Sequence, residues 1–216
     1  MEQKRPRNTT RLREAAAASR AETRRLLLEA AAEEFTRVGY VAATVNRIAE
    51  RAGVTVQTLY LAWGSKRALL RGYLDSTLAP GTVPSAKHFS SQIHCDDPGG
   101  TLAQIAKLFC GVAQRSAIAW RAYRDGAAVD KAIAEEWQQL QALRRATFSE
   151  LLATIPDDAL QLPREDAVDT AWAIAGPASY ELLVSGAGYS LQRFEVWVTT
   201  TLRNALLKPS ALKVGA

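Results

Sequence analysis

The sequence has little of the chemistry on which disulfide-stabilised proteins, metalloproteins and most hydrolytic enzymes depend. Its 216 residues include only two cysteines and two histidines. Cys95 and Cys110 are too few, and too ordinary in spacing, for a disulfide framework or a zinc module. No glycine-rich loop follows a strand pattern, and no set of nucleophile, base and orienting residue is recognisable. We therefore expect no enzymatic activity, no metal and no cofactor.

One short segment does gather side chains with metal-ligand chemistry. His88, His94 and Cys95 are followed by two aspartates. They fall within residues 79–100, a proline- and glycine-rich connection with no helical or knuckle spacing to fix a ligand set. We interpret them as ordinary loop residues.

Long apolar segments are also missing. No uncharged run exceeds 14 residues, whereas a membrane-spanning helix needs about 20. The basic N-terminus is not followed by the apolar stretch of a signal peptide. These absences predict a soluble, cytoplasmic protein without a membrane partner.

The residues that are abundant favour helix. Hydrophobic residues make up 48% of the chain, with alanine and leucine dominant, β-branched residues sparse and no recurring alternation of period two. Residues 1–75 hold 14 Lys and Arg against 8 Asp and Glu, while residues 76–216 hold 13 against 14. We predict an all-α protein with a near-neutral body. Its basic end is either a polyanion-binding region or a solvated tail.

Caps and glycines mark short helices near the N-terminus. A first helix is expected over about 20–38, ended by Gly39. Thr44 can cap a second helix, and Gly53 permits the sharp turn after it. Thr55 can cap a third helix, which Gly64 closes. Two short helices joined by a glycine turn are typical of a helix-turn-helix.

This segment resembles the DNA-binding domain of the TetR family of bacterial regulators. The resemblance rests on the LLEAAAEEF helix, the Gly39-Tyr40 break, residues 44–54, the Leu59-Tyr60 pair and the GSKRALL sequence that ends at Leu70. It covers about a fifth of the chain. The family usually has phenylalanine where this chain has Trp63, and often histidine or tyrosine where it has Ala62.

The resemblance implies a repressor that leaves a palindromic operator when a small-molecule effector binds. The implied parts are a basic N-terminal arm (1–19), a three-helix helix-turn-helix domain (20–65), a larger helical ligand-binding and dimerisation domain (66–208) and a C-terminal tail (209–216). The implied partners are double-stranded DNA, the effector and a second copy of the chain. An activator or an architectural DNA-binding protein without a sensor is the alternative.

The positions of polar residues in this motif predict which of them contact DNA. The candidates are Thr44, Arg47, Thr55, Gln57, Thr58, Tyr60 and Lys66. Gln57, Thr58 and Thr55 lie at the N-terminal end of the recognition helix, the part that reaches base edges. Tyr60 and Lys66 suit phosphate oxygens, whereas Arg47 suits either a phosphate or bulk water.

Aromatic residues spread over the middle helices are candidates for the effector pocket, although aromatic residues at helical spacing more often belong to the core. They are Phe109, Trp120, Tyr123, Trp137, Phe148 and Trp172. The last two long helices, expected over about 165–185 and 191–208, resemble the family's dimerisation element. Their predicted interface residues are Trp172, Ala175, Ser179, Leu183, Phe194, Trp197, Val198, Thr201 and Leu202.

Overall fold

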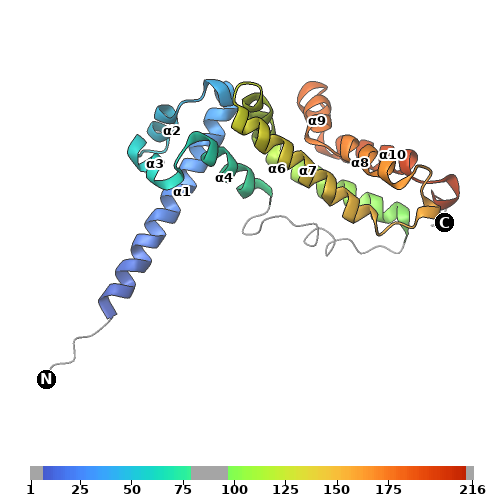
Figure 1. Ribbon diagram of the computed structural model, residues 1–216, viewed down its shortest axis with the longest axis horizontal. Coiled ribbons are helices and arrows are strands. Elements are labelled where there is room, and N and C mark those ends of the chain that lie inside the picture. Colours follow the sequence, from blue (N-terminus) through green and yellow to red (C-terminus); the bar gives the residue numbers. More distant parts are fainter. Residues whose placement is uncertain (1–6, 79–96, 213–216) are drawn as a thin grey trace. The chain divides into compact units, whose positions relative to one another are not determined.

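The computed structural model describes residues 7–78 and 97–212, and helices account for most of them (Figure 1). The chain divides into two compact units, residues 1–74 and 75–216. The described residues form no β-strand, and one isolated antiparallel bridge joins Leu160 to Leu207. The all-α prediction is confirmed. Within the same residues, no helix is long and apolar enough to cross a bilayer.

The helices follow one another with short connections. The first unit contains α1 (Arg7–Ala42), α2 (Val45–Arg51), α3 (Val56–Trp63) and most of α4 (Lys66–Leu78), which ends in the second unit. The second unit contains α6 (Pro98–Ala127), α7 (Lys131–Leu152), the 3-10 turn η1 (Asp157–Ala159), α8 (Arg164–Ile174), α9 (Pro177–Tyr180), the π-helix η2 (Glu181–Gly186), α10 (Leu191–Leu206) and the 3-10 turn η3 (Pro209–Leu212). Most of the predicted connection at 79–100, including His88, His94 and Cys95, lies outside the described residues.

The first helix is longer than the sequence pattern predicts. It begins at Arg7 rather than near Arg20, so much of the predicted arm is helical. The alanines at 15–18 are strong helix formers and explain the extension. Gly39 interrupts the helix with φ 75° and ψ 165°, where the break was expected.

The predicted helix over 165–185 is divided into three parts. α8 ends at Ile174, and Pro177 is the first residue of α9, because a proline lacks the N–H that a helix interior requires. The chain then widens into the six-residue π-helix η2. Glu181, the first residue of η2, therefore lies in a turn whose backbone hydrogen bonds join residues five apart rather than four.

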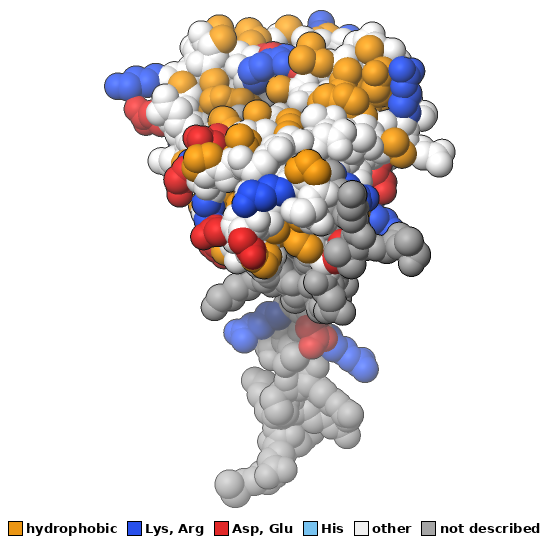
Figure 2. Space-filling view, turned by 90° about the vertical axis from the view of Figure 1, so that its right-hand side faces the viewer, with side chains coloured by type: hydrophobic (Ala, Val, Ile, Leu, Met, Phe, Trp, Pro, Cys, Tyr) orange, Lys and Arg blue, Asp and Glu red, His pale blue; other side chains and the backbone are white. Residues whose placement is uncertain are grey.

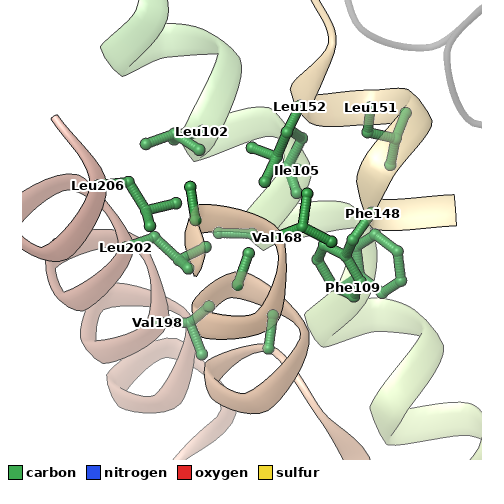
Figure 3. Packing of buried hydrophobic residues seen from close by; sticks show 14 of the residues in the cluster. Leu102, Ile105, Phe109, Phe148, Leu151, Leu152, Val168, Val198, Leu202 and Leu206 are labelled. Carbon is green, nitrogen blue, oxygen red and sulfur yellow. The ribbon is translucent and has the colours of Figure 1, made fainter. Parts of the chain in front are cut away.

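The core of the second unit is built from four helices (Figure 3). Phe109 of α6 and Phe148 of α7 stack with their ring centroids 4.1 Å apart. Val168 of α8 and Val198 of α10 are fully buried among them. Figure 3 shows these side chains directed toward one another.

This core corrects part of the predicted dimer interface. Ala175, Phe194, Val198 and Leu202 are at most 5% exposed within a single chain. The stripe on α10 is thus covered by its own chain, chiefly by α6 and α8. Partly exposed positions among the predicted set are Trp172, Ser179, Leu183, Trp197 and Thr201.

Apolar side chains nevertheless remain on the surface of the second unit. Leu182 of η2 is 71% exposed, and Leu191 and Val196 of α10 are 41% and 59% exposed. Figure 2 shows one face of the molecule, on which hydrophobic side chains gather toward the top.

Candidate functional site

The turn between α2 and α3 is set by local hydrogen bonds. The Thr44 side chain accepts from the Arg47 N–H at 3.3 Å and caps α2. Gly53 turns the chain with φ 68°. The Thr55 side chain accepts from the Thr58 N–H at 3.1 Å and caps α3. The predicted caps are confirmed, and they fix where α3 begins.

The outward face of α3 combines polar and apolar groups. Gln57 is exposed, Tyr60 is 47% exposed and Leu61 is 82% exposed. These positions are related by three and four residues, so they share one helical face. Leu59 is fully buried on the other side. Sequence reasoning missed Leu61, although its spacing from Gln57 places it beside that residue.

The threonine hydroxyls of α3 have local partners as well. The Thr55 and Thr58 hydroxyl oxygens lie 2.9 Å apart. Each hydroxyl has one donor hydrogen and two acceptor lone pairs, so a partner on the chain leaves further capacity. The C-terminal end of α3 is held by Arg24 of α1, which donates to the Ala62 carbonyl and lies 3.8 Å from the Trp63 ring centroid.

Lys66 lies differently from its predicted position at a phosphate. Its ammonium donates to the carbonyl oxygens of Tyr40 at 2.9 Å and Ala43 at 2.8 Å. It also lies 4.2 Å from the Tyr40 ring centroid. Lys66 therefore ties the start of α4 to the end of α1, which is a structural role rather than the predicted one.

A buried carboxylate organises the arginines of α1 and α2. Glu34 is 0% exposed, and Arg37 donates to it at 2.8 Å. Arg51 and Arg47 of α2 approach it at 3.6 and 3.9 Å. The Arg37 hydrogen bond holds the pKa of Glu34 below its ordinary value, against the opposing effect of burial. Arg47, 56% exposed, is thus oriented by an internal partner.

The second unit contains a hollow between α6, α7 and the α9–η2 segment. An inner part of about 80 Å³ is lined by Trp120, Arg121, Trp137 and Arg144 among others. A more open part of about 560 Å³ shares Arg121 and four other lining residues with it. We call the two together the α6–α7 pocket.

The predicted pocket residues separate into two groups. Trp120 and Trp137 line the α6–α7 pocket and meet edge to face, with centroids 5.3 Å apart. Phe109, Tyr123 and Phe148 are buried and do not line it. Trp172 is partly exposed and lies beside Arg144. Sequence reasoning missed Arg121 and Arg144, because nothing in their spacing distinguishes them from surface arginines.

No group of three His, Cys, Asp or Glu side chains in the described part of the chain is arranged to hold a metal ion. The predicted loop residues His88, His94 and Cys95 lie outside that part.

Helix α2, the turn at Gly53 and the capped, outward-facing α3 form a helix-turn-helix. The family model of the bacterial regulatory proteins of the tetR family matches residues 27–73. This match covers about a fifth of the chain, so residues 27–73 are similar to the N-terminal domain of that family. A comparison with curated protein sequences finds no match.

Solved structures share the fold over most of the chain. NalD of Pseudomonas aeruginosa, the secondary repressor of the MexAB-OprM multidrug efflux pump, is 17% identical with a TM-score of 0.66, covering 88% of this chain and 99% of NalD. SmeT in complex with triclosan is 17% identical with a TM-score of 0.65, covering 90% and 96%. TylP, a TetR regulator from Streptomyces fradiae, is 22% identical with a TM-score of 0.56, covering 89% and 90%.

Proposed function

We propose that this protein is a homodimeric, cytoplasmic repressor that reads a palindromic operator through α3 and releases it when a small molecule binds the second unit. The outward face of α3 carries this proposal. A short helix held by caps at its start and by Arg24 at its end presents Gln57, Tyr60 and Leu61 to solvent. Such a helix suits the major groove.

The side chains on this face suit different parts of DNA. Gln57 can pair with both polar atoms of an adenine edge, and Leu61 can contact a thymine methyl group. Tyr60, Arg47 and Thr44 suit phosphate oxygens, which position the protein without reading sequence. Thr55 and Thr58 lie at the start of the helix, where their remaining hydrogen-bonding capacity can reach a base edge or a phosphate.

Dimerisation would place two copies of α3 one helical turn of DNA apart, about 34 Å. The exposed apolar residues Leu182, Leu191 and Val196 support it, since a partner can cover them together with Leu183 and Trp197. The core residues Phe194, Val198 and Leu202 take no part in this interface.

Control by a small molecule is supported by the α6–α7 pocket and by the triclosan bound to the structurally similar SmeT. A ligand shifts an equilibrium only as far as it binds one state more tightly than the other. The effector would therefore bind best to the conformation whose two recognition helices no longer fit the operator.

Operator selection from random duplexes, followed by base substitution, tests the reading of DNA. Gln57→Ala should relax the preference at one base pair of each half-site. Leu61→Ala should weaken binding about fourfold per half-site, as expected for one buried methyl-sized group. Replacing the contacted thymine with uracil should weaken wild type equally and leave Leu61→Ala unaffected.

Gln138→Ala is the matched control, because Gln138 is exposed on α7 of the second unit. It should bind every duplex as wild type does. Failure to enrich any sequence would contradict the proposed function, whereas enrichment without an effect of Gln57→Ala or Leu61→Ala would contradict only the residue roles.

A further inference from the structure

Arg144 of α7 is a largely enclosed cation without an acidic partner. Its two terminal nitrogens both donate to the Trp172 carbonyl oxygen at 2.9 Å, and its Nε lies 3.5 Å from the Gln141 amide oxygen. In the described part of the chain, no carboxylate forms an ion pair with it. Burial lowers the pKa of Arg144 to about 10. Enclosed charges normally have a counter-ion, so this site is electrostatically incomplete.

The guanidinium is held in place by its surroundings. It lies 5.1 Å from the Trp172 ring centroid and 5.8 Å from that of Phe148. An added Cβ on Gly176 would lie 3.3 Å from both terminal nitrogens, so the glycine leaves room for the group. A guanidinium has five N–H donors. The Trp172 carbonyl and the Gln141 amide therefore leave further N–H donors on Arg144, which lines the pocket.

The other charges of the α6–α7 pocket do not balance Arg144. Arg121 and Arg124 line it, against a single glutamate, Glu181. Glu181 pairs with Arg124 and lies 3.6 Å from the Arg121 Nε. That Nε is buried and has no hydrogen-bond partner. Three arginines and one glutamate give the lining a positive balance.

Aromatic and aliphatic side chains also line the pocket. Trp120 and Trp137 meet edge to face, and Pro177 adds an aliphatic ring. Tryptophan faces favour flat rings, and the inner volume of about 80 Å³ suits one ring, with further space in the open part.

We propose that the α6–α7 pocket binds a small aromatic carboxylate, with the ring against Trp120 and Trp137 and the carboxylate on Arg144 and Arg121. The carboxylate supplies the counter-ion that the chain itself lacks. Arginine suits this group because its planar fork can donate two parallel hydrogen bonds. As the identity of the effector, this inference rests on the proposed function; as a binding site, it stands on the pocket alone.

Calorimetric titration of the full-length protein tests the inference without DNA. The probes are benzoate and indole-3-acetate, each compared with its neutral carboxamide. We expect the acids to bind at least about tenfold more tightly than the amides, since a hydrogen bond to a charged group is lost in the amide. Equal binding of acid and amide, or no binding of either acid at millimolar concentration, would overturn the inference.

Two variants and one control assign the preference to residues. Arg144→Gln and, independently, Arg121→Gln should each reduce the ratio of acid to amide affinity severalfold or more. Arg145→Gln is the matched control, because Arg145 is the next residue and pairs with Asp169 and Glu165 at the surface. It should keep the wild-type ratio. An unchanged ratio in both pocket variants would count against the site, and Arg121→Gln decides if Arg144→Gln does not fold.

An operator titration in the presence of saturating indole-3-acetate separates this inference from the proposed function. Binding of the acid through Arg144 without release of the operator would support the site and contradict the effector role. Release of the operator by a compound that binds independently of Arg144 and Arg121 would support control by a small molecule and contradict the proposed site.

Discussion

The two units treat a buried charge in opposite ways. In the first unit Glu34 is 0% exposed and three arginines surround it, one of them hydrogen-bonded at 2.8 Å. In the second unit Arg144 is enclosed beside Trp172, with a backbone carbonyl as its principal acceptor. The buried charge of the first unit is therefore balanced within the chain, whereas the proposed ligand would balance that of the second. This difference agrees with the functions proposed for the two units, DNA binding for the first and binding of a small anion for the second.

The largest expected effect is the salt dependence of the two kinds of anion binding. Six to ten phosphate contacts would reduce operator affinity by about 10³–10⁵ between 50 and 200 mM salt. Binding of benzoate to the α6–α7 pocket should fall less than about threefold, because a single enclosed pair is screened less. Operator and benzoate titrations across this range measure how steeply each affinity falls with salt. Equal slopes would contradict the expected difference between the two units.

Removing the buried carboxylate of the first unit should be costly. Glu34→Ala leaves Arg37, Arg47 and Arg51 without their shared acceptor and opens space between α1 and α2, for an expected loss of about 2–3 kcal/mol. The neighbouring Glu33 is 62% exposed, so Glu33→Ala should cost less than about 1 kcal/mol. Hydrogen exchange of the amides at 27–35 reports the stability of this unit. Similar losses in both variants would show that burial of Glu34 is unimportant.

Alanine at two helical glycines should change stability in opposite directions in the two units. A Cβ on Gly72 of α4 would lie 2.1 Å from the Trp63 ring, so Gly72→Ala should destabilise by about 1–3 kcal/mol. A Cβ on Gly111 of α6 would meet only the flexible end of Arg115 at 3.3 Å, so Gly111→Ala should stabilise by up to about 1 kcal/mol. Urea unfolding measures both. Trp63→Leu should relieve the strain of Gly72→Ala, and no relief would indicate another cause.

The smallest expected effect is the loss of folding stability at low pH. Because the pKa of Glu34 is lowered in the folded state, its contribution to stability is present above the unfolded value of about 4.3. It is lost as the pH falls through the lower folded value. Between pH 7 and pH 3 wild type should therefore lose more stability than Glu34→Gln. Urea unfolding at several pH values tests this, and parallel curves would mean that Glu34 titrates alike in both states.

The sequence predicts the first unit well where its signals act over a few residues. Thr44 and Thr55 cap helices through N–H groups three residues ahead, and Gly53 bends its own backbone. Lys66 shows where such reasoning ends. Its acceptors lie 26 and 23 residues earlier in the chain, so only the folded structure reveals that its charge is directed inward.

The second unit was harder to predict because periodicity identifies a buried face but not the element that covers it. Phe194, Val198 and Leu202 form the apolar stripe that both a dimer interface and an internal core would require. The structure assigns them to the core of a single chain. No sequence pattern marks Arg144 or Arg121, since only the folded structure shows that both line one pocket and that no carboxylate in the described residues pairs with Arg144.

Helix α1 runs without a break from Arg7 to Gly39, so the described part of the basic N-terminal segment is helical and not a flexible arm. Arg13 and Arg20 are exposed and lie 11 and 4 residues before Arg24, so all three lie close to one helical face. Since Arg24 is bound to the end of α3, that face has a defined direction relative to the recognition helix. At 1.5 Å per residue, Arg13 stands about 16 Å along the axis from Arg24. A flexible arm would spread its arginines over a range of positions that grows with its length, whereas a helix holds Arg13 and Arg20 at fixed distances from Arg24.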